Sequence, residues 1–371
     1  MLPAMETRPS SVNPWLLIFF GATLFFALVG FLLYRWSLTR NDSGQIAAQL
    51  IKRQNTVLAY DAMSIAREVA HLIENASRDV QVLSLVAPTR GNFMKFYLSH
   101  ISSVTRSDPR DESTDMVPLP LYNELIALNS SGDETLRLRN GRFEPHLRRR
   151  SQCAYYNLCD PKLIEEGMKL PVGELLFGHV LRYYTPEREP QFSDEGTLPV
   201  LYRSSDGLVI LGIDYRYFRE ILMEPVFPYE RKRNLLQAYQ NGNYIYLIDD
   251  RMDFLAHPKP WHVAGIDKKT GLPVPPMKTD ADEGTHPLNV AAYQTGKIKT
   301  LLDRLAKKSL VQNAVDIFEA PNLTGTTRVL SVAPIPLTKG QYRQMGVFGH
   351  VVIGCSVDYF EEPKEQYVPY Y

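Results

Sequence analysis

The sequence is poor in cysteine and lacks the spacings that metal sites and haem attachment require. Its three cysteines are Cys153, Cys159 and Cys355, and no two of them form a CxxC pair. The eight histidines are scattered without an HxxxH spacing. We therefore predict no metal site and no cofactor.

An excess of charge of either sign is also missing. The 41 Lys and Arg balance the 41 Asp and Glu, so no nucleic-acid partner is indicated. The sequence contains no glycine-rich phosphate loop, nucleophile elbow, HExxH or DxDxDG pattern. The paired carboxylates Asp249 and Asp250 fall in a predicted turn, where we expect solvent to surround them. These absences predict a binding protein and no enzyme.

One long hydrophobic run lies near the N-terminus. Pro14 to Tyr34 contains 21 residues without a charged side chain. At a rise of about 1.5 Å per residue this run matches a hydrocarbon core of about 30 Å. A cleaved signal peptide would have a shorter apolar region and a small-residue cleavage site. We predict an uncleaved, single-pass transmembrane helix over residues 14–34, behind a short cytoplasmic head at residues 1–13. The flanking arginines alone leave its orientation open.

A long helix is predicted to follow the span, over residues 41–87, with Pro88 ending it. Its apolar positions alternate steps of four and three residues, as one seam of a helix does: Leu58, Ala62, Ile65, Val69, Leu72 and Ala76. The seam can pack on the helix's own domain or on a second copy in a homodimer, and the sequence leaves both open.

From Leu121 the pattern changes to the alternation typical of strands. A hairpin is predicted over residues 121–139, with Gly132 taking a positive φ in its turn. Further strands are predicted at residues 179–184, 198–203 and 208–218. We expect the preceding segment, residues 92–120, to be an irregular, solvated connection. Closely spaced strands joined by hairpins predict an antiparallel sheet that the long helix covers on one face, an α+β module.

The second half of the chain repeats this order. A second hairpin begins near Asn243, and strands are predicted at residues 314–320, 327–335 and 347–360. The segment Val209–Phe218 aligns with Val351–Phe360, which places Gly212 on Gly354 and Asp214 on Ser356. The second copy carries roughly twenty more residues, which we place in the proline-rich loop 258–284. Helices are expected at residues 230–240 and 288–310.

These segments resemble the double Cache (dCache) family, the extracellular sensor domains of bacterial chemoreceptors, histidine kinases and diguanylate cyclases. The resemblance covers about residues 41 to 362. It is carried by the span running into a long helix, by LIDDRMDFLAHP, by PVGELLFGHVLRYYTPERE before LVILGIDYRYF, and by APIPL before VVIGCSVDYF. It implies two tandem PAS-like antiparallel-sheet modules on one long helix: a membrane-distal module over residues 88–228 and a membrane-proximal one over 229–362, with a tail at 363–371.

The resemblance also implies a function. We expect a bacterial sensor that is anchored in the cytoplasmic (inner) membrane, lies mainly in the periplasm or outside the cell, and binds a small molecule in its first module. Receptors of this family usually cross the membrane again to reach an output domain, whereas here EEPKEQYVPYY follows Phe360. We therefore expect a separate signalling partner. The alternatives are an anchored interaction or assembly protein with this fold and no ligand pocket, and a truncated receptor.

Asp214 is the first candidate for ligand binding. One copy of the module carries this carboxylate where the other carries the hydroxyl of Ser356. A carboxylate facing a pocket can hold a ligand ammonium or order an arginine, and one at a strand end can equally cap a turn. The family's amino-acid-binding members carry such an Asp together with a Tyr, Arg and Trp-Tyr constellation. Here Arg150, Tyr155 and Tyr156 lack the tryptophan and the spacing.

Strand alternation adds polar and aromatic candidates. It puts Arg182 and Tyr184 on one face of their strand and Tyr202 on the same face as Val200. Tyrosines on strands also serve as half-buried packing residues, so both interpretations stay open. The predicted ligand-binding set is Asp214, Arg182, Tyr184, Tyr202, Tyr155 and Tyr156.

The remaining cysteines and histidines have structural interpretations. Cys153 and Cys159 enclose five residues; in an oxidising compartment they can close a disulfide, or they can remain free thiols. Cys355, in an apolar strand, is expected to be a small core residue. His257 precedes a proline at a strand end, and we expect it to be structural.

Overall fold

The computed structural model describes residues 28–31, 55–107, 114–152, 160–184, 196–223, 244–292, 316–321 and 327–356. The chain divides into two compact units, Met1–Gln54 and Asn55–Tyr371. In the first unit, residues 28–31 are helical. Within the described ranges no helix is both long and apolar enough to cross a bilayer. The predicted span lies outside these ranges except for residues 28–31.

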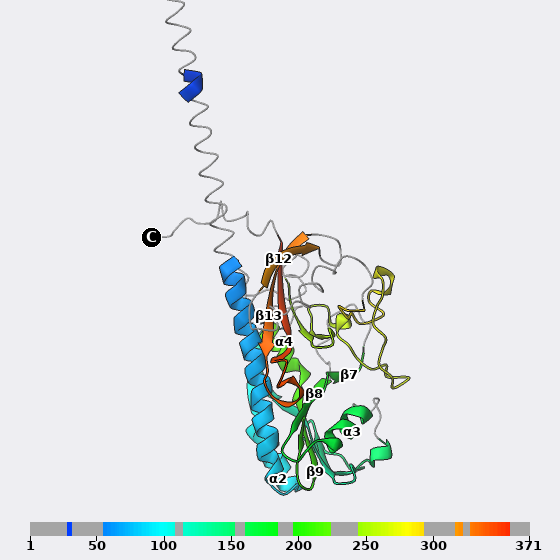
Figure 1. The fold of residues 1–371 in the computed structure, drawn as a ribbon. Coiled ribbons are helices and arrows are strands. Elements are labelled where there is room, and N and C mark those ends of the chain that lie inside the picture. The colour runs from blue at the N-terminus through cyan, green and yellow to red at the C-terminus, as the bar shows by residue number, and fades with distance from the viewer. Residues whose placement is uncertain are drawn as a thin grey trace, which may run out of the picture. The chain divides into compact units, whose positions relative to one another are not determined.

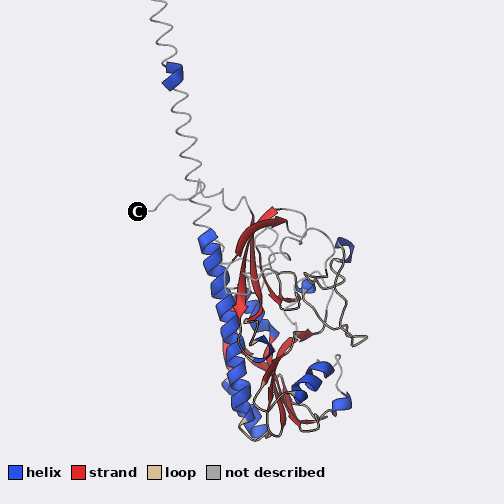
Figure 2. Ribbon diagram, viewed as in Figure 1, coloured by secondary structure: helices blue, strands red, loops and turns tan. Residues whose placement is uncertain are grey.

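A helix over residues 55–84 runs along the second unit (Figures 1 and 2). It ends before Pro88, as the sequence predicts. Its buried face repeats at helical spacing, because only one stripe of an amphipathic helix can face a core: Leu58, Ala62, Ile65, Ala66, Val69, Ala70, Ile73, Ala76, Val80 and Leu83. In this chain the predicted seam packs on the helix's own domain, with Ile73 fully buried and Leu72 only partly so.

The first sheet is antiparallel and has seven strands. They run in the order β5-β4-β3-β9-β8-β6, and β7 also pairs with β8. The strands are β3 (Tyr122–Asn129), β4 (Glu134–Arg139), β5 (Arg142–Phe143), β6 (Leu175–Phe177), β7 (Leu181–Arg182), β8 (Gly196–Arg203) and β9 (Gly207–Asp214). Gly132 has a φ of 82° in the β3–β4 turn, as expected.

The second sheet is antiparallel with five strands in the order β11-β10-β14-β13-β12. The strands are β10 (Tyr244–Asp249), β11 (Phe254–Ala256), β12 (Asp316–Pro321), β13 (Thr327–Pro336) and β14 (Val347–Ser356). In both sheets the last strand lies beside the first strand of the opening hairpin. The loop predicted to hold the extra residues contains two short 3-10 helices, Pro260–His262 and Asp280–Asp282.

The two sheets share their register as well as their strand order. Gly212 of β9 pairs with Glu124 of β3, and Gly354 of β14 pairs with Tyr244 of β10. These are the glycines that the internal sequence alignment places on one another. The two glycines therefore hold equivalent positions in the ladders of the two sheets.

The segment expected to be irregular, residues 92–120, instead contains regular secondary structure in its described parts, residues 92–107 and 114–120. It contains most of α2 (Arg90–Ser99) and a hairpin of β1 (Ile101–Ser107) with β2 (Thr114–Pro120). The Thr89 side chain accepts the Asn92 N–H at the start of α2, and only Phe93 and Tyr97 of that helix are buried. The prediction was wrong because two buried residues give a weak helical pattern. A hairpin held by backbone hydrogen bonds needs no apolar alternation.

The strand predicted to extend to Phe218 ends at Asp214, where α4 (Tyr215–Met223) begins. Phe218, Ile221 and Leu222 of α4 lie in the main core, at helical spacing. Tyr215 lies in a different cluster, together with Tyr244 and Tyr246 of the second sheet. The helix therefore joins the end of the first sheet directly to the second module.

Three other predicted elements are shorter than expected, not helical where described, or undescribed. The strand predicted at residues 179–184 is reduced to β7. Residues 288–292 of the predicted helix 288–310 are not helical; the Asn289 side chain accepts the N–H groups of Ala291 and Ala292 and so closes a turn. The rest of that helix and the linking helix at 230–240 lie outside the described residues.

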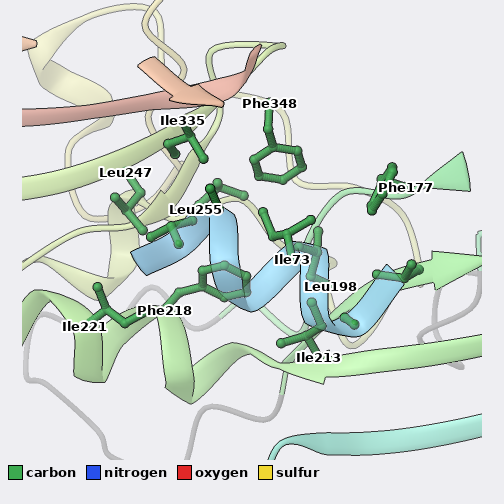
Figure 3. Close-up of a cluster of buried hydrophobic side chains, with 14 of the residues drawn as sticks. Ile73, Phe177, Leu198, Ile213, Phe218, Ile221, Leu247, Leu255, Ile335 and Phe348 are labelled. Carbon is green, nitrogen blue, oxygen red and sulfur yellow. The ribbon is translucent and has the colours of Figure 1, made fainter. Parts of the chain in front are cut away.

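One hydrophobic core joins both sheets to the long helix (Figure 3). Ile73 of the helix lies beside Leu198 and Ile213 of the first sheet, and residues of the second sheet close the other side: Leu247, Leu255, Ile335 and Phe348. The two sheets therefore depend on the same helical face for burial of their inner surfaces.

A polar contact at Asp79 fixes the C-terminal half of the long helix. Tyr122 Oη donates to Asp79 Oδ2 over 2.5 Å, and His100 Nε2 lies 3.3 Å from the same oxygen. The hydrogen bond with Asp79 raises the pKa of His100. Burial alone would raise the pKa of Asp79, but hydrogen bonds from His100 and Tyr122 lower it.

Replacement of Ile73 by Ala should lower the free energy of unfolding by about 2–5 kcal/mol, because it leaves a cavity in the shared core. Val82 of the same helix is 55% exposed, and Val82→Ala should change stability by less than about 0.5 kcal/mol. Urea denaturation of both variants measures the difference. Equal losses in the two variants would contradict the assignment of the buried face.

The His100 contact should make stability depend on pH. A raised folded-state pKa means that the contribution of His100 is complete below its unfolded pKa of about 6.5 and is lost as pH rises through the folded value. The wild type should therefore exceed His100→Gln in unfolding free energy more at pH 5.5 than at pH 8.5, by up to about 1 kcal/mol. Urea denaturation at both pH values tests this, and a difference that grows toward pH 8.5 would refute it.

Candidate functional site

The face of the first sheet that points away from the long helix has an apolar and a polar part. Helix α3 (Pro161–Lys169) covers the apolar part, where its Leu163 and Ile164 pack on Leu201 and Ile210. Figure 1 shows α3 on the opposite side of this sheet from the long helix. The polar part lies toward the end of β9, where strand alternation puts Gly212 and Asp214 on the same face as Ile210.

Asp214 is 1% exposed and holds an arginine in a bidentate contact. Arg216 Nε donates to its Oδ1 over 2.9 Å, and Arg216 Nη2 donates to its Oδ2 over 2.6 Å. The Arg216 backbone N–H also donates to Oδ1, at 2.9 Å, which starts α4. The structure thus combines two roles considered for this carboxylate, ordering an arginine and capping a turn. The Arg216 side chain is 41% exposed, so the pair reaches the surface.

Two buried oxygens beside Asp214 have no hydrogen-bond partner among the described residues. Thr197 pairs with Asp214 across the β8–β9 ladder, and its Oγ1 is unpaired. Asn123 donates its Nδ2 to the Gly196 carbonyl over 2.7 Å, but its Oδ1 accepts nothing. A β-carbon at Gly212 would collide with Thr197 Oγ1 and lie 3.2 Å from Asn123 Oδ1. Both oxygens therefore converge over the bare backbone of Gly212.

The corresponding place in the second sheet is filled. A β-carbon on Gly354 would collide with the ring of Tyr244, which therefore covers this glycine. The Tyr244 ring stacks on that of Tyr246, with centroids 5.8 Å apart. Because an aromatic ring occupies this position, the described residues of the second module do not repeat the polar arrangement.

A buried ion cluster borders the site. Arg137, 1% exposed, pairs with Glu124 and with Glu134, whose Oε1 it meets at 2.8 Å. Burial raises the pKa of Glu124, and the charge of Arg137 opposes that rise. Removing one partner of such a cluster leaves an uncompensated buried charge. We therefore expect the Arg137–Glu124–Glu134 cluster to hold this edge of the site rigid.

The structure places Arg182 on the strand face opposite to that of Thr197 and Asp214, and it buries Tyr184. Leu181 pairs with Thr197, so Arg182 lies on the opposite face of its strand. Its guanidinium carbon stands 5.4 Å from the centre of the Tyr215 ring. Tyr184 is buried, and burial raises its pKa to about 12. Its hydroxyl has no hydrogen-bond partner within the described ranges.

The other predicted residues are placed as follows. Tyr202 packs against the main core and so lies on the inner face. Cys355 and His257 are buried, and His257 Nδ1 accepts the Lys259 N–H over 2.9 Å. Arg150 starts a 3-10 turn. Tyr155, Tyr156, Cys153 and Cys159 lie outside the described residues.

The sequence alone missed Asn123, Thr197 and Arg216. Arg216 had a usable signal, since it follows the strand-end Asp214 by two residues, a spacing at which a side chain can fold back. The sequence gives no comparable signal for Thr197 and Asn123. Their position depends on the pairing of three strands and on a register shift between Tyr122 and Glu124.

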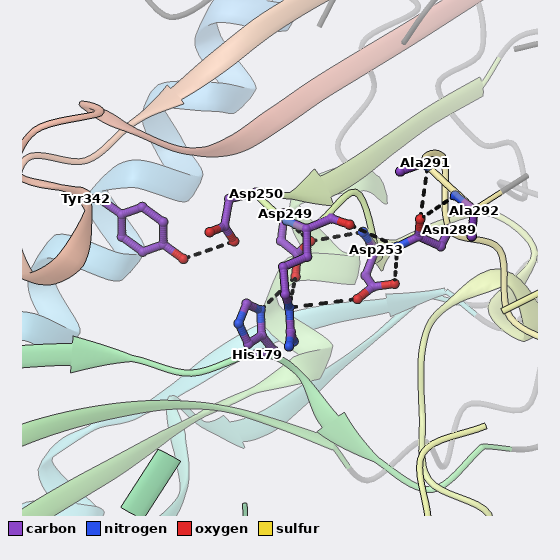
Figure 4. Close-up of polar contacts among 9 residues, drawn as sticks. His179, Asp249, Asp250, Asp253, Asn289, Ala291, Ala292 and Tyr342 are labelled. Atoms are coloured by element: carbon purple, nitrogen blue, oxygen red, sulfur yellow. Dashed lines mark hydrogen bonds and ion pairs between the residues drawn. The ribbon is translucent and has the colours of Figure 1, made fainter. Parts of the chain in front are cut away.

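Asp249, expected to be solvated, is 2% exposed. Its Oδ1 accepts the backbone N–H groups of Arg251 and Asp253, each over 2.9 Å. Its Oδ2 lies 2.9 Å from Nδ1 of His179, which the first module supplies (Figure 4). The prediction was wrong for Asp249, whose side chain faces the first module, whereas Asp250 is not buried.

Comparison with known proteins gives matches among solved structures only. No protein-family model matches the sequence, and no curated relative is found. The ligand-binding domain of the Pseudomonas aeruginosa amino-acid chemoreceptor PctC, in complex with GABA, is 12% identical with a TM-score of 0.38, over 81% of this chain and 100% of that one. The corresponding domain of the Campylobacter jejuni chemoreceptor Tlp3, with L-valine, is 10% identical with a TM-score of 0.42, over 85% and 98%.

A stronger likeness in fold is that to the periplasmic sensory domain of the Campylobacter jejuni chemoreceptor Tlp1. The match covers 85% of this chain and 99% of that domain, with 8% identity and a TM-score of 0.51. At this identity the likeness is one of fold, and it agrees with the duplicated sheets on one helix described above. The chain therefore has the fold of the double Cache-type sensory domains that its sequence resembles.

Proposed function

We propose that this protein is a sensor that binds a small molecule on the polar face of its first module. The observation that carries the proposal is the pair of buried, unpaired oxygens, Thr197 Oγ1 and Asn123 Oδ1, next to Asp214. A buried polar atom without a partner costs about 1–3 kcal/mol. A ligand that supplies hydrogen-bond donors would remove this cost.

The chemistry of the site indicates the class of ligand. Asn123 Oδ1 is an acceptor, the Thr197 hydroxyl can accept, and Asp214 is a carboxylate, so the surroundings favour a donor-rich group such as an amine. Arg216, partly exposed beside them, can meet an anionic group of the same molecule. The ligand proposed is thus a small amine, with or without an acidic group.

The proposal extends to location and signalling. The Tlp1 domain, whose fold this chain shares, is described as a periplasmic sensory domain of a chemoreceptor. By analogy, residues 55–371 lie outside the cytoplasm, Pro14–Tyr34 anchors them in the inner membrane, and a separate partner receives the signal. We propose a binding role and no enzymatic activity. Signalling requires two conformational states of the sensor, and a ligand shifts the equilibrium between them only by the difference in its affinity for the two.

One observation favours the alternative of an interaction protein without a ligand. Both carboxylate oxygens of Asp214 are already engaged by Arg216, and Tyr202 packs into the core. Two of the predicted ligand-binding side chains, Asp214 and Tyr202, are therefore already engaged within the protein. The experiment below separates the two functions.

Thermal unfolding should be measured against amines, amino acids, organic acids and purines. A ligand at a hundred times its Kd stabilises the native state by about 2.7 kcal/mol, so the melting midpoint of the wild type should rise. Thr197→Val keeps the volume but removes one hydrogen bond to a charged group, which should weaken binding about ten- to a hundredfold. Asp214→Ala should abolish the response.

The matched control is Thr135→Val, in β4 of the same sheet, where the hydroxyl donates to the Ala127 carbonyl. This variant should keep the ligand response. No response from the wild type to any compound, with cooperative unfolding, would instead favour the interaction protein. A response that Thr197→Val retains in full would place the ligand elsewhere.

A further inference from the structure

A second polar cluster lies where the two modules meet, apart from the proposed ligand site (Figure 4). His179 comes from the segment between β6 and β7, Asp249 is the last residue of β10, and Asp250 begins the turn that follows. One nitrogen or oxygen from each of the three side chains lies within 4.8 Å of the others. The three potential ligands thus come from segments 70 residues apart in the chain.

The positions of these side chains are fixed by their surroundings. Backbone N–H groups of the turn hold Asp249 Oδ1, which leaves Oδ2 facing His179. Tyr342, in the 3-10 turn Gly340–Tyr342, donates to Asp250 Oδ1 over 3.2 Å. Asn289 donates to Asp253 Oδ1 over 2.7 Å. The carboxylates are therefore oriented by groups that do not neutralise them.

The charges in the cluster do not balance. Among the described residues, the three carboxylates of Asp249, Asp250 and Asp253 face one cationic side chain, Arg251, and one histidine. The Arg251 Nε stands 4.0 Å from Asp249 and from Asp253, and its side chain is 53% exposed.

We propose that His179, Asp249 and Asp250 form a binding site for a divalent transition-metal ion such as Zn²⁺. An imidazole nitrogen with two carboxylates suits Zn²⁺ and its neighbours, whereas Mg²⁺ and Ca²⁺ prefer oxygen ligands alone. In a tetrahedral zinc site with bonds of about 2.0–2.2 Å, ligand atoms stand about 3.3–3.6 Å apart. The 2.9 Å from His179 Nδ1 to Asp249 Oδ2 needs to open only slightly.

The ion would join the two modules. His179 precedes β7 of the first sheet, and the two carboxylates stand at the end of β10 of the second sheet. The ion would replace the hydrogen bond between His179 and Asp249 by coordination to both side chains. Three protein ligands leave a fourth position for water or another ligand. This site shares no residue with the proposed ligand site, so either can fail without affecting the other.

The test uses the full chain, stripped with EDTA and dialysed against Zn²⁺, with Mg²⁺ and Ca²⁺ as comparison ions. We expect one Zn²⁺ per chain and a higher melting midpoint. Asp250→Asn keeps the shape and the Asp249–His179 contact, and should weaken Zn²⁺ binding by at least about tenfold, since even losing an outer-shell partner costs ~10–100-fold. His179→Gln should do the same. Asp206→Asn, at an exposed carboxylate of the β8–β9 turn, should leave affinity unchanged.

Two results would overturn the proposal. One is a wild type that takes up no Zn²⁺ in stoichiometric amount. The other is Zn²⁺ uptake that Asp250→Asn and His179→Gln retain at full affinity, which would assign the ion to other residues such as the cysteines. Equal affinity for Mg²⁺ would refute the choice of metal class.

Discussion

The burial of one face of one helix is the interaction on which the rest of this fold depends. Residues 55–84 supply a single apolar stripe, and the inner faces of two separate sheets both pack on it. Small side chains at Ala62, Ala66, Ala70 and Ala76 are fully or nearly fully buried along the stripe, and so let the sheets approach closely. Neither sheet has another described helix of comparable length to cover its inner face. Burial of apolar surface on the shared helix therefore holds the two modules together, in addition to their covalent connection.

With the inner faces committed to the helix, the two copies differ on their outer faces. In the first copy, Gly212 is surrounded by Thr197 and Asn123 and lies near Asp214; in the second, Tyr244 covers Gly354. Gly212 and Gly354 hold equivalent ladder positions in the two sheets, so the difference arises from the side chains around them and from the register shift that positions Asn123. A duplicated fold can in this way keep one polar face for binding and fill the other with aromatic rings.

The strands and the long helix were predictable because each carries a periodic apolar pattern that burial enforces. Helix α4 was not predictable, since Tyr215 and Tyr217 continue the alternation of Leu211 and Ile213 in β9, and a short apolar run does not distinguish strand from helix. The hairpin of β1 and β2 lacks any apolar pattern. Within the candidate site, Asp214 followed from comparison of the two copies. Thr197, Asn123 and the His179–Asp249 contact could not be predicted, because they depend on strand pairing and on the approach of two modules.

The junction at Asp214 and Tyr215 has a mechanical consequence. These neighbours belong to different parts of the molecule: the carboxylate faces the polar site of the first sheet, while the next ring is embedded among Tyr244 and Tyr246 of the second. One peptide bond, which is planar and stiff, is all that separates them. A movement of the Asp214 backbone therefore also moves the first residue of α4, whose ring lies in the core of the second module.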